Sequence, residues 1–156
     1  MLKVGIAFFS GTGNTWRVAQ QYAAAFGWHG HTAELLPIED LVRSNDHTWL
    51  MAYDLLGLAY PVYAWNAPRL VLRFLDGLPY HQDKPVFVAL TAGGSLGGAL
   101  AYVQRRLSRL GYEVQHAAHY YTGSYYGSRA TREQSEQEML KRLEWIDSEV
   151  WEAVSE

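Results

Sequence analysis

Cysteine is absent from this chain of 156 residues, and its absence excludes several kinds of chemistry. The chain cannot form a disulfide, use a thiolate nucleophile, or hold zinc or an iron–sulfur cluster through cysteine. A long hydrophobic run is missing as well. The uncharged stretch at residues 55–68 contains Gly57 and Pro61 and is shorter than the roughly 20 apolar residues that cross a bilayer. The sequence therefore predicts no membrane span.

An excess of positive charge is also missing, because the net charge is −3 at pH 7. A general attraction to nucleic acid is therefore not expected. The first residues, "MLKVGIAFFSG", contain a short apolar run that glycine interrupts, and no small-residue cleavage site follows as it would in a secretory signal. We expect these residues to form the first strand of a cytoplasmic protein.

Length and composition indicate one domain that spans residues 1–156. Hydrophobic residues make up 49% of the chain, which is enough for a sizeable core at this length. The 6 Trp and 11 Tyr favour extensive ring packing or a flat ligand. The six histidines, in pairs such as "HGH" and "HAAH", lack the helical spacing of two metal ligands, so no metal site is expected.

Short apolar runs alternate with helical patterns from end to end. The runs predict strands at residues 2–8, 32–36, 53–59, 86–91 and 113–120. The patterns predict helices at residues 13–26, 38–43, 66–76, 95–110 and 132–153. Such alternation is typical of an α/β fold, with a five-stranded, parallel, doubly wound sheet between two layers of helices.

Capping signals mark the ends of several of these helices. Asn66 is placed to cap a helix with Pro68 in its first turn and Gly77 just past its end. Ser95 is placed to open a helix that Gly111 closes. "TREQ", residues 131–134, fits a capping box at the start of the last helix.

Four loops should meet at one edge of such a sheet, beyond the carboxyl ends of the strands, where α/β proteins bind ligands. They are residues 9–15, 60–66, 91–95 and 121–131. The first contains "SGTGNT", which opens a helix and suits a phosphate through its amides and hydroxyls. It lacks the Gly-Lys-Ser/Thr ending of a Walker loop and the third glycine of a dinucleotide loop. A terminal phosphate monoester fits best, and a plain turn before a capped helix is the alternative.

Here the chain resembles a known family. "FFSGTGNT" resembles the FMN-phosphate loop of flavodoxins, and Ser10, Thr12, Gly13 and Thr15 match its pattern in full. "GLAYPVYAWNAP" and "ALTAGGSLGGA" resemble the two loops that flank the flavin. The sequence of these motifs most resembles that of flavodoxin domains that are elsewhere fused to a ferredoxin module, which this cysteine-free chain lacks. It also lacks the insertion of long-chain flavodoxins.

The resemblance implies that FMN binds noncovalently, with its phosphate in the first loop and its ring between the other two. The implied FMN-binding residues are Ser10, Gly11, Thr12, Gly13, Asn14, Thr15, Pro61, Val62, Tyr63, Ala64, Trp65, Asn66, Thr91, Ala92, Gly93 and Gly94.

Aromatic side chains can cover the faces of a flavin ring. Tyr63 and Trp65 are the candidates in the second loop, while Tyr60 is equally a core residue. No aromatic follows Gly93 and Gly94, so a tyrosine of residues 121–131 is a candidate for the outer face, namely Tyr121, Tyr125 or Tyr126.

Flavodoxins commonly stabilise the one-electron form of FMN by flipping a peptide beside the ring, which glycine permits at low cost. This chain has Ala64, Trp65 and Asn66 there. Asn66 tolerates left-handed geometry, so a flip is expected to be possible but costlier. The balance of one- and two-electron chemistry is therefore open.

Charge placement departs from the family. Flavodoxins usually surround FMN with carboxylates that dock basic partners, whereas residues 1–33 contain no acid and half of all acids lie from Glu133 onward. Arg69 and Arg73 are the arginines expected nearest to the ring. Such a rim would attract acidic partners or anionic substrates, unless the arginines face solvent far from the ring.

The resemblance therefore implies a monomeric electron carrier that shuttles electrons between redox proteins, from a reductase or ferredoxin-type donor to an acceptor. No catalytic side chain is expected, because FMN carries the chemistry. The alternative is an FMN-dependent oxidoreductase acting on a small molecule such as a quinone. A third possibility is a binding module that has lost flavin, against which the intact phosphate loop argues.

Overall fold

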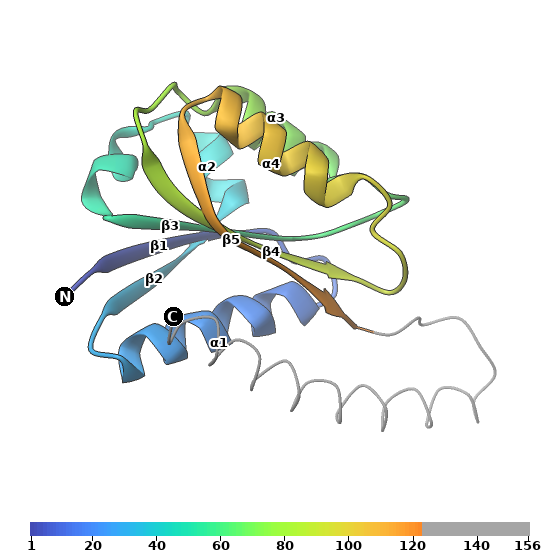
Figure 1. Ribbon diagram of the computed structural model, residues 1–156, viewed down its shortest axis with the longest axis horizontal. Coiled ribbons are helices and arrows are strands. Elements are labelled where there is room, and N and C mark those ends of the chain that lie inside the picture. The colour runs from blue at the N-terminus through green and yellow to red at the C-terminus, as the bar shows by residue number, and fades with distance from the viewer. Residues whose placement is uncertain (123–156) are drawn as a thin grey trace.

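A computed structural model describes residues 1–122 of the chain (Figure 1). The helix expected at residues 132–153, its capping box, and Tyr125 and Tyr126 lie outside the described residues. Within them, no helix is both long and apolar enough to cross a membrane. No group of three or more histidines and carboxylates is arranged to hold a metal ion in this part of the chain.

A five-stranded sheet forms the middle layer. Its strands are β1 (Lys3–Phe8), β2 (Thr32–Pro37), β3 (Leu55–Pro61), β4 (Lys84–Ala92) and β5 (Tyr112–Tyr121). Every pair is parallel and the order is β2-β1-β3-β4-β5. The predicted α/β class and doubly wound parallel sheet are confirmed, and the three inner strands, β1, β3 and β4, are the ones buried on both faces.

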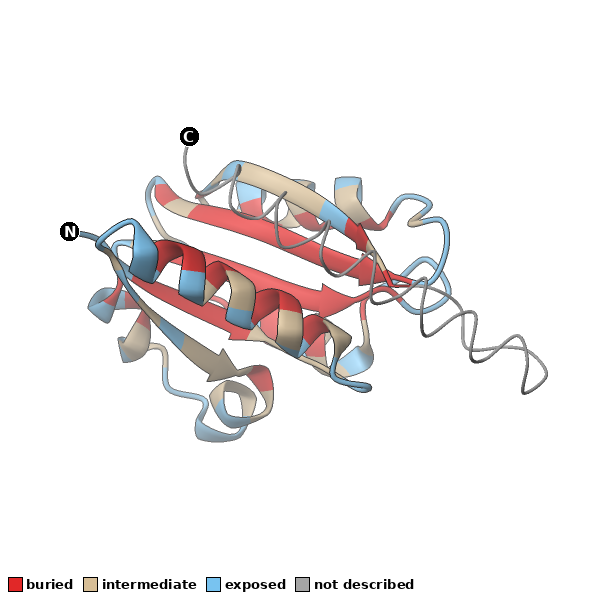
Figure 2. Ribbon diagram, turned by 90° about the horizontal axis from the view of Figure 1, so that it is seen from below, coloured by how far each residue is buried: buried red, intermediate tan, exposed pale blue. Residues whose placement is uncertain are grey.

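Helices cover both faces of the sheet. They are α1 (Asn14–Trp28), α2 (Ile38–Ser44), α3 (Arg69–Gly77) and α4 (Ala99–Arg109). Helix α1 lies on one face, while α2, α3 and α4 lie on the other (Figure 1). Figure 2 looks at the α1 face and shows buried strands behind this helix, whose outer side is exposed. The three-layer arrangement is thus present in the described residues.

Aromatic rings join α1 to the sheet. The ring of Tyr22 stacks on that of Phe87 with centroids 4.6 Å apart, and its hydroxyl lies 2.7 Å from the hydroxyl of Tyr120. The ring of Phe87 fills the space that a side chain at Gly57 would need. Helix α1 is therefore positioned by contacts with β3, β4 and β5, and its first residues are held at the carboxyl end of β1.

Two helices begin later than the sequence predicts. Helix α3 starts at Arg69 with Pro68 as its N-cap, and Asn66 does not cap it, because its Oδ1 accepts from the amide of Ala67 at 2.8 Å. The residue before a proline is disfavoured in helical geometry, so the helix follows Pro68. Gly77 is the last residue of α3 rather than the residue after it.

Helix α4 starts at Ala99 rather than at Ser95. The Ser95 hydroxyl accepts from the amide of Gly97 at 3.2 Å, and Gly97 has φ +54°, so residues 95–98 form a turn before the helix. Gly111, with φ +80°, follows the end of α4 as predicted.

A 3₁₀ helix, η1 (Thr48–Ala52), was not predicted. The ammonium of Lys84, only 9% exposed, donates to the carbonyls of Leu50, at 3.0 Å, and Tyr53. Burial lowers the pKa of Lys84, while the charge of Asp54 opposes this change. Lys84 therefore satisfies the carbonyls at the end of η1 from a strand that lies 31 or more residues away in sequence.

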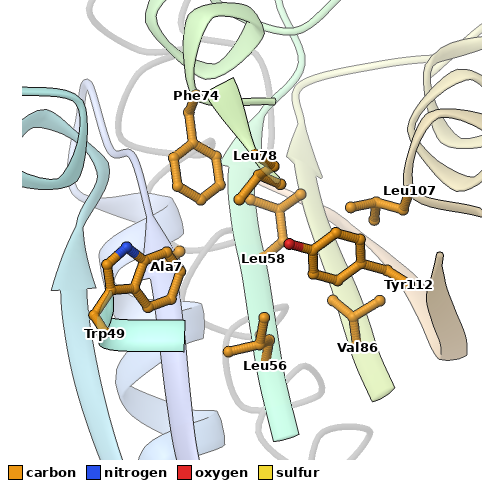
Figure 3. A pocket seen from close by; sticks show the side chains of 10 residues that line it. Ala7, Trp49, Leu56, Leu58, Phe74, Leu78, Val86, Leu107 and Tyr112 are labelled. Carbon is orange, nitrogen blue, oxygen red and sulfur yellow. The ribbon is translucent and has the colours of Figure 1, made fainter. Parts of the chain in front are cut away.

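A small apolar cavity lies between the sheet and the helices of the α3 face (Figure 3). Its volume is about 20 Å³, and Trp49, Phe74, Leu107 and Tyr112 line it together with β1, β3 and β4. This volume holds at most one water molecule. The cavity is thus a packing gap in the core and not a site for a cofactor.

Candidate functional site

The candidate site lies at the edge of the sheet where the chain reverses its direction of winding. Strand β1 is paired with β2 on one side and β3 on the other, so the chain passes from β1 outward to β2 and then returns to β3. Ligands of doubly wound sheets bind at this switch point, beyond the carboxyl ends of the strands. The loops at residues 9–13, 62–68 and 93–98 meet there, on the right of Figure 1.

Residues 10–13 form a tight turn that opens α1. Gly13 has φ +94° and is the N-cap of the helix, which a residue with a side chain would adopt only with strain. The Ser10 hydroxyl accepts from the amide of Gly13 at 3.1 Å. The first helical bond runs from the amide of Arg17 to the carbonyl of Gly13 at 3.0 Å. The amides of residues 14–16 therefore have no helical acceptor and, in residues 1–122, no other one.

This turn fits an anionic phosphate. A Cβ on Gly13 would meet nothing within 4 Å, so the space in front of the turn is open. Helix α1 has no acidic residue in its first turn, and its amino end carries partial positive charge. Thr12 is exposed and Asn14 is half-buried, so amides, hydroxyls and a side-chain amide surround the open space.

Thr15 has a different place from the other residues of the loop. It is only 1% exposed, and its hydroxyl lies 2.7 Å from the hydroxyl of Thr91 at the end of β4. Either hydroxyl can be the donor. This contact fixes the first turn of α1 against β4.

Tyr63 reaches from the loop after β3 across to the phosphate loop. Its hydroxyl oxygen lies 2.5 Å from the point where a Cβ on Gly11 would stand, so a side chain at position 11 would displace the hydroxyl. The sequence suggested Tyr63 as a ring-stacking residue. In the structure its hydroxyl lies beside Gly11, where a hydroxyl can also donate to a phosphate, and the ring-stacking role stays a prediction.

Residues 63–66 form a hairpin turn of type I′. The amide of Tyr63 donates to the carbonyl of Asn66 at 2.9 Å, and the amide of Asn66 donates back at 3.0 Å. Ala64 and Trp65, at φ +47° and +62°, are left-handed, whereas such turns favour Asn-Gly. Asn66 itself is not left-handed in this structure, and the costlier peptide flip expected at these residues stays a prediction.

Trp65 connects the second loop to the third. Its indole is 68% exposed, and its Cδ1, Cγ and Cβ atoms lie 2.9 to 3.2 Å from the position of a Cβ on Gly97. Gly97 was not among the predicted site residues, because nothing in the sequence around it indicates a partner 32 residues away. A flat exposed indole at this edge can stack on an aromatic ring.

The other predicted residues fall into two groups. Gly93 and Gly94 are exposed, and a Cβ on Gly94 would face open space. The buried group packs in the ends of β3 and β4 or just beyond them, and its members are Pro61, Val62, Thr91 and Ala92. These residues join the loops, since the amide of Val62 donates to the carbonyl of Thr91 at 2.8 Å.

Tyr60 is a core residue, fully buried in β3. Its hydroxyl has no hydrogen-bond partner among the described residues. Burial raises the pKa of the Tyr60 phenol, and Tyr102 adds to the increase. The interpretation of Tyr60 as a core aromatic therefore holds in this structure.

The charged residues around the site are few. Arg69 is exposed at the first position of α3. Arg73, one turn later, lines a surface depression of about 120 Å³ together with His47 and Gly77, toward the other end of the helix. Arg106 forms an ion pair with Asp76. Arg69 and Arg73 are the two arginines expected nearest to the ring, and of these two Arg69 stands at this edge.

Comparisons with known proteins agree with the fold. No protein-family model and no curated protein sequence matches the chain. Among solved structures, the two-electron reduced flavodoxin of Megasphaera elsdenii is 24% identical, over 85% of this chain and 96% of that one, with a TM-score of 0.67. An oxidised flavodoxin of Bacillus cereus is 21% identical, over 94% and 98%, with a TM-score of 0.66.

An azoreductase of Bacillus anthracis is also similar, at 12% identity over 97% of this chain and 100% of that chain, with a TM-score of 0.63. At these low sequence identities, the similarity shows a shared fold and nothing further. The chain therefore has a flavodoxin-like fold, which is shared by flavodoxins and by azoreductases.

Proposed function

We propose that the chain binds one FMN noncovalently and carries electrons between redox proteins as a monomeric cytoplasmic carrier of a single domain. The observation that supports FMN most strongly is the turn at residues 10–15. Within residues 1–122 the amides of residues 14–16 have no acceptor, the Tyr63 hydroxyl lies beside Gly11, and the loop at this helix amino end contains hydroxyls and no lysine. This donor set suits a terminal phosphate that keeps its own charge.

On this proposal, different residues of the chain bind the phosphate and the ring of FMN. Ser10, Thr12 and the amides of residues 14–16 would hold the phosphate, and Tyr63 would close over it. The ring would lie between residues 63–66 and Gly93–Gly94, with the Trp65 indole as the stacking surface. FMN supplies the capacity to accept and donate electrons, and the chain sets access and potential. We assign no side chain to acid or base catalysis.

Electron transfer is the leading function because the loops that would hold the ring are exposed. Trp65, Gly93 and Gly94 face solvent at one edge of the molecule, so a partner protein can approach the ring closely. The partners on this proposal are a reductase or ferredoxin-type donor and a separate acceptor.

The second candidate is an FMN-dependent oxidoreductase that acts on a small molecule such as a quinone. The type I′ turn favours it, because Ala64 and Trp65 occupy left-handed positions without glycine. A peptide flip in this turn is therefore expected to be harder than in a turn with glycine. The similarity to an azoreductase points the same way.

Stepwise anaerobic reduction of the FMN-loaded protein distinguishes the two candidates. Visible absorption is followed while reductant is added in small portions. A long-wavelength band of the neutral one-electron form, growing to a maximum midway, would support the electron carrier. Bleaching without that band, together with turnover of NAD(P)H and a quinone, would place the oxidoreductase first.

A further inference from the structure

The helices that begin around the candidate site lack the carboxylates that usually neutralise helix amino ends. The first turns of α1, α3 and α4 contain no acidic residue, although acids are favoured there. Among the helices of residues 1–122, only α2, which follows the edge strand β2, has acids in its first turn, namely Glu39 and Asp40. Asp40 is paired with Arg43 at 3.2 Å. The edge between β1 and β4 is thus positive.

Five of the eight acids of the described residues lie at the opposite edge of the sheet. Each of these acids stands near the end of a helix or the start of a strand. They are Asp46, Asp54, Asp76, Asp83 and Glu113. In a parallel sheet, helix ends and strand starts share one edge, away from the ligand loops. Bases such as Lys3, Lys84 and Arg109 stand at that edge as well, so its charges are mixed. The loops and helix starts between β1 and β4, in contrast, carry Arg17 and Arg69 and no acid.

Exposed aromatic and arginine side chains mark the positive edge. Trp16 is 46% exposed, Trp65 68% and Tyr102 38%, and each stands in a loop or the first turns of a helix. Arg17 and Arg69 stand in the first turns of α1 and α3 and form no ion pair within residues 1–122. Helical side chains lean toward the amino end of their helix, so these groups point to the same edge.

We propose that this aromatic–arginine edge, formed by Trp16, Arg17, Trp65, Arg69 and Tyr102, docks a small redox protein with an acidic surface. The proposal rests on the proposed electron-carrier function and names the partner class. Trp, Tyr and Arg are the residues enriched in protein interfaces. Their spread over three elements suits a protein surface rather than one small anion.

Charge would also orient the partner. The positive edge attracts an acidic protein, whereas the mixed charges of the opposite edge do not, so that encounters place the partner at the loops proposed to hold the flavin. The partner loses one electron for each electron that FMN gains, and no covalent bond forms or breaks between the two proteins.

A plant-type [2Fe–2S] ferredoxin with an acidic surface is the probe. Its binding to the chain is measured by sedimentation velocity with and without FMN, and its reaction with the FMN-loaded chain by anaerobic stopped flow. Both are repeated from low to high ionic strength, with basic cytochrome c as the contrasting partner. We expect the ferredoxin rate constant to fall about tenfold over this range, because salt screens exposed charges beyond a few ångströms.

Two variants make the test specific to the edge. Arg69→Glu, at the start of α3, should lower the ferredoxin rate about tenfold at low salt and remove most of its salt dependence. Arg109→Glu makes the same charge change at an exposed residue at the end of α4, and it should leave the rate within about twofold.

Three results would overturn the docking proposal. They are equal effects of the two variants, a ferredoxin rate that rises with salt, and Arg69-dependent reduction of an anionic quinone in place of ferredoxin binding. Salt-sensitive ferredoxin binding by a chain that takes up no FMN would support the docking and contradict the proposed function. FMN uptake without such binding would leave the function standing and contradict the docking.

Discussion

At the scale of single residues, the site depends on contacts between residues far apart in the sequence. The Tyr63 hydroxyl occupies the space beside Gly11, and the hydroxyls of Thr15 and Thr91 meet at 2.7 Å. Each contact joins the phosphate loop to a different strand end. The loop is therefore held open from outside its own segment, as a preformed anion site requires.

Replacement of Tyr63 tests its assignment to the phosphate. Tyr63→Phe removes only the hydroxyl, and a hydrogen bond to a charged group contributes about 1.5–3 kcal/mol. FMN should therefore bind about tenfold more weakly or worse, while riboflavin, which has no phosphate, should bind as before. Flavin fluorescence quenching measures both affinities. An equal loss for the two flavins would show that Tyr63 acts on the ring instead.

The buried hydroxyl of Tyr60 gives a pH-dependent prediction. Burial raises its pKa above the ordinary 10.0, so the folded chain holds this proton more tightly than the unfolded chain does. The stabilisation is fully present below pH 10 and is lost as the pH rises, by about 1.4 kcal/mol per pH unit.

Tyr60→Phe should reduce this alkaline loss. The variant should also be at least as stable as the parent near pH 7, because the hydroxyl has no partner in residues 1–122 and an unpaired buried group is unfavourable. Urea unfolding at pH 7, 9 and 11 measures both effects. A variant with the parent's pH dependence would contradict the assignment.

At the scale of elements, the hydrophobic pattern predicted the strands and helices whose formation depends on burying apolar side chains. All five strands follow from apolar runs, and α1 follows from a stripe whose Val18, Ala19 and Tyr22 are buried. The predicted starts of α3 and α4 were wrong, because Pro68 and the turn at Gly97 delay these helices beyond the residues with capping signals. The prediction that residues 10–15 bind a phosphate could be made from sequence because the donors are neighbours in the chain.

Other elements escaped prediction because distant residues determine them. Helix η1 is completed by Lys84, and Trp65 packs against Gly97. The left-handed pair Ala64–Trp65 has none of the residues that normally mark a type I′ turn. No local periodicity or composition indicates such contacts, so they had to come from the three-dimensional structure.

A pair of glycines tests how tightly the elements are joined. Gly30 and Gly111 have φ near +80°, but a Cβ on Gly30 would meet nothing within 4 Å, whereas one on Gly111 would collide with the carbonyl of His81. Gly30→Ala should cost about 1 kcal/mol for the left-handed geometry alone. Gly111→Ala should cost about 3 kcal/mol, since the loop before β4 must move as well.

Urea unfolding monitored by tryptophan fluorescence compares the two glycine variants. The difference between them isolates the contact between the α4–β5 turn and the loop at His81, whose amide donates to the carbonyl of Leu110 at 2.8 Å. Equal losses of stability in the two variants would contradict the close packing at Gly111.

At the scale of the whole molecule, two features coincide at one edge of the sheet. The loops that fit a flavin phosphate and ring lie there, and so do the helix amino ends without acids, Arg17 and Arg69. The net charge of the whole chain, −3, does not indicate that positive groups lie at this edge. Placement of charge relative to the sheet, and not its total, therefore decides which partners can approach the site.

The central claim is that the edge holds FMN through its phosphate, and a titration of the flavin-free protein with FMN and with riboflavin tests it most directly. We expect one FMN per chain, with riboflavin bound at least about a hundredfold more weakly, because several hydrogen bonds to a charged phosphate are lost. Equal affinity for the two flavins, or no quenching by FMN, would contradict the account.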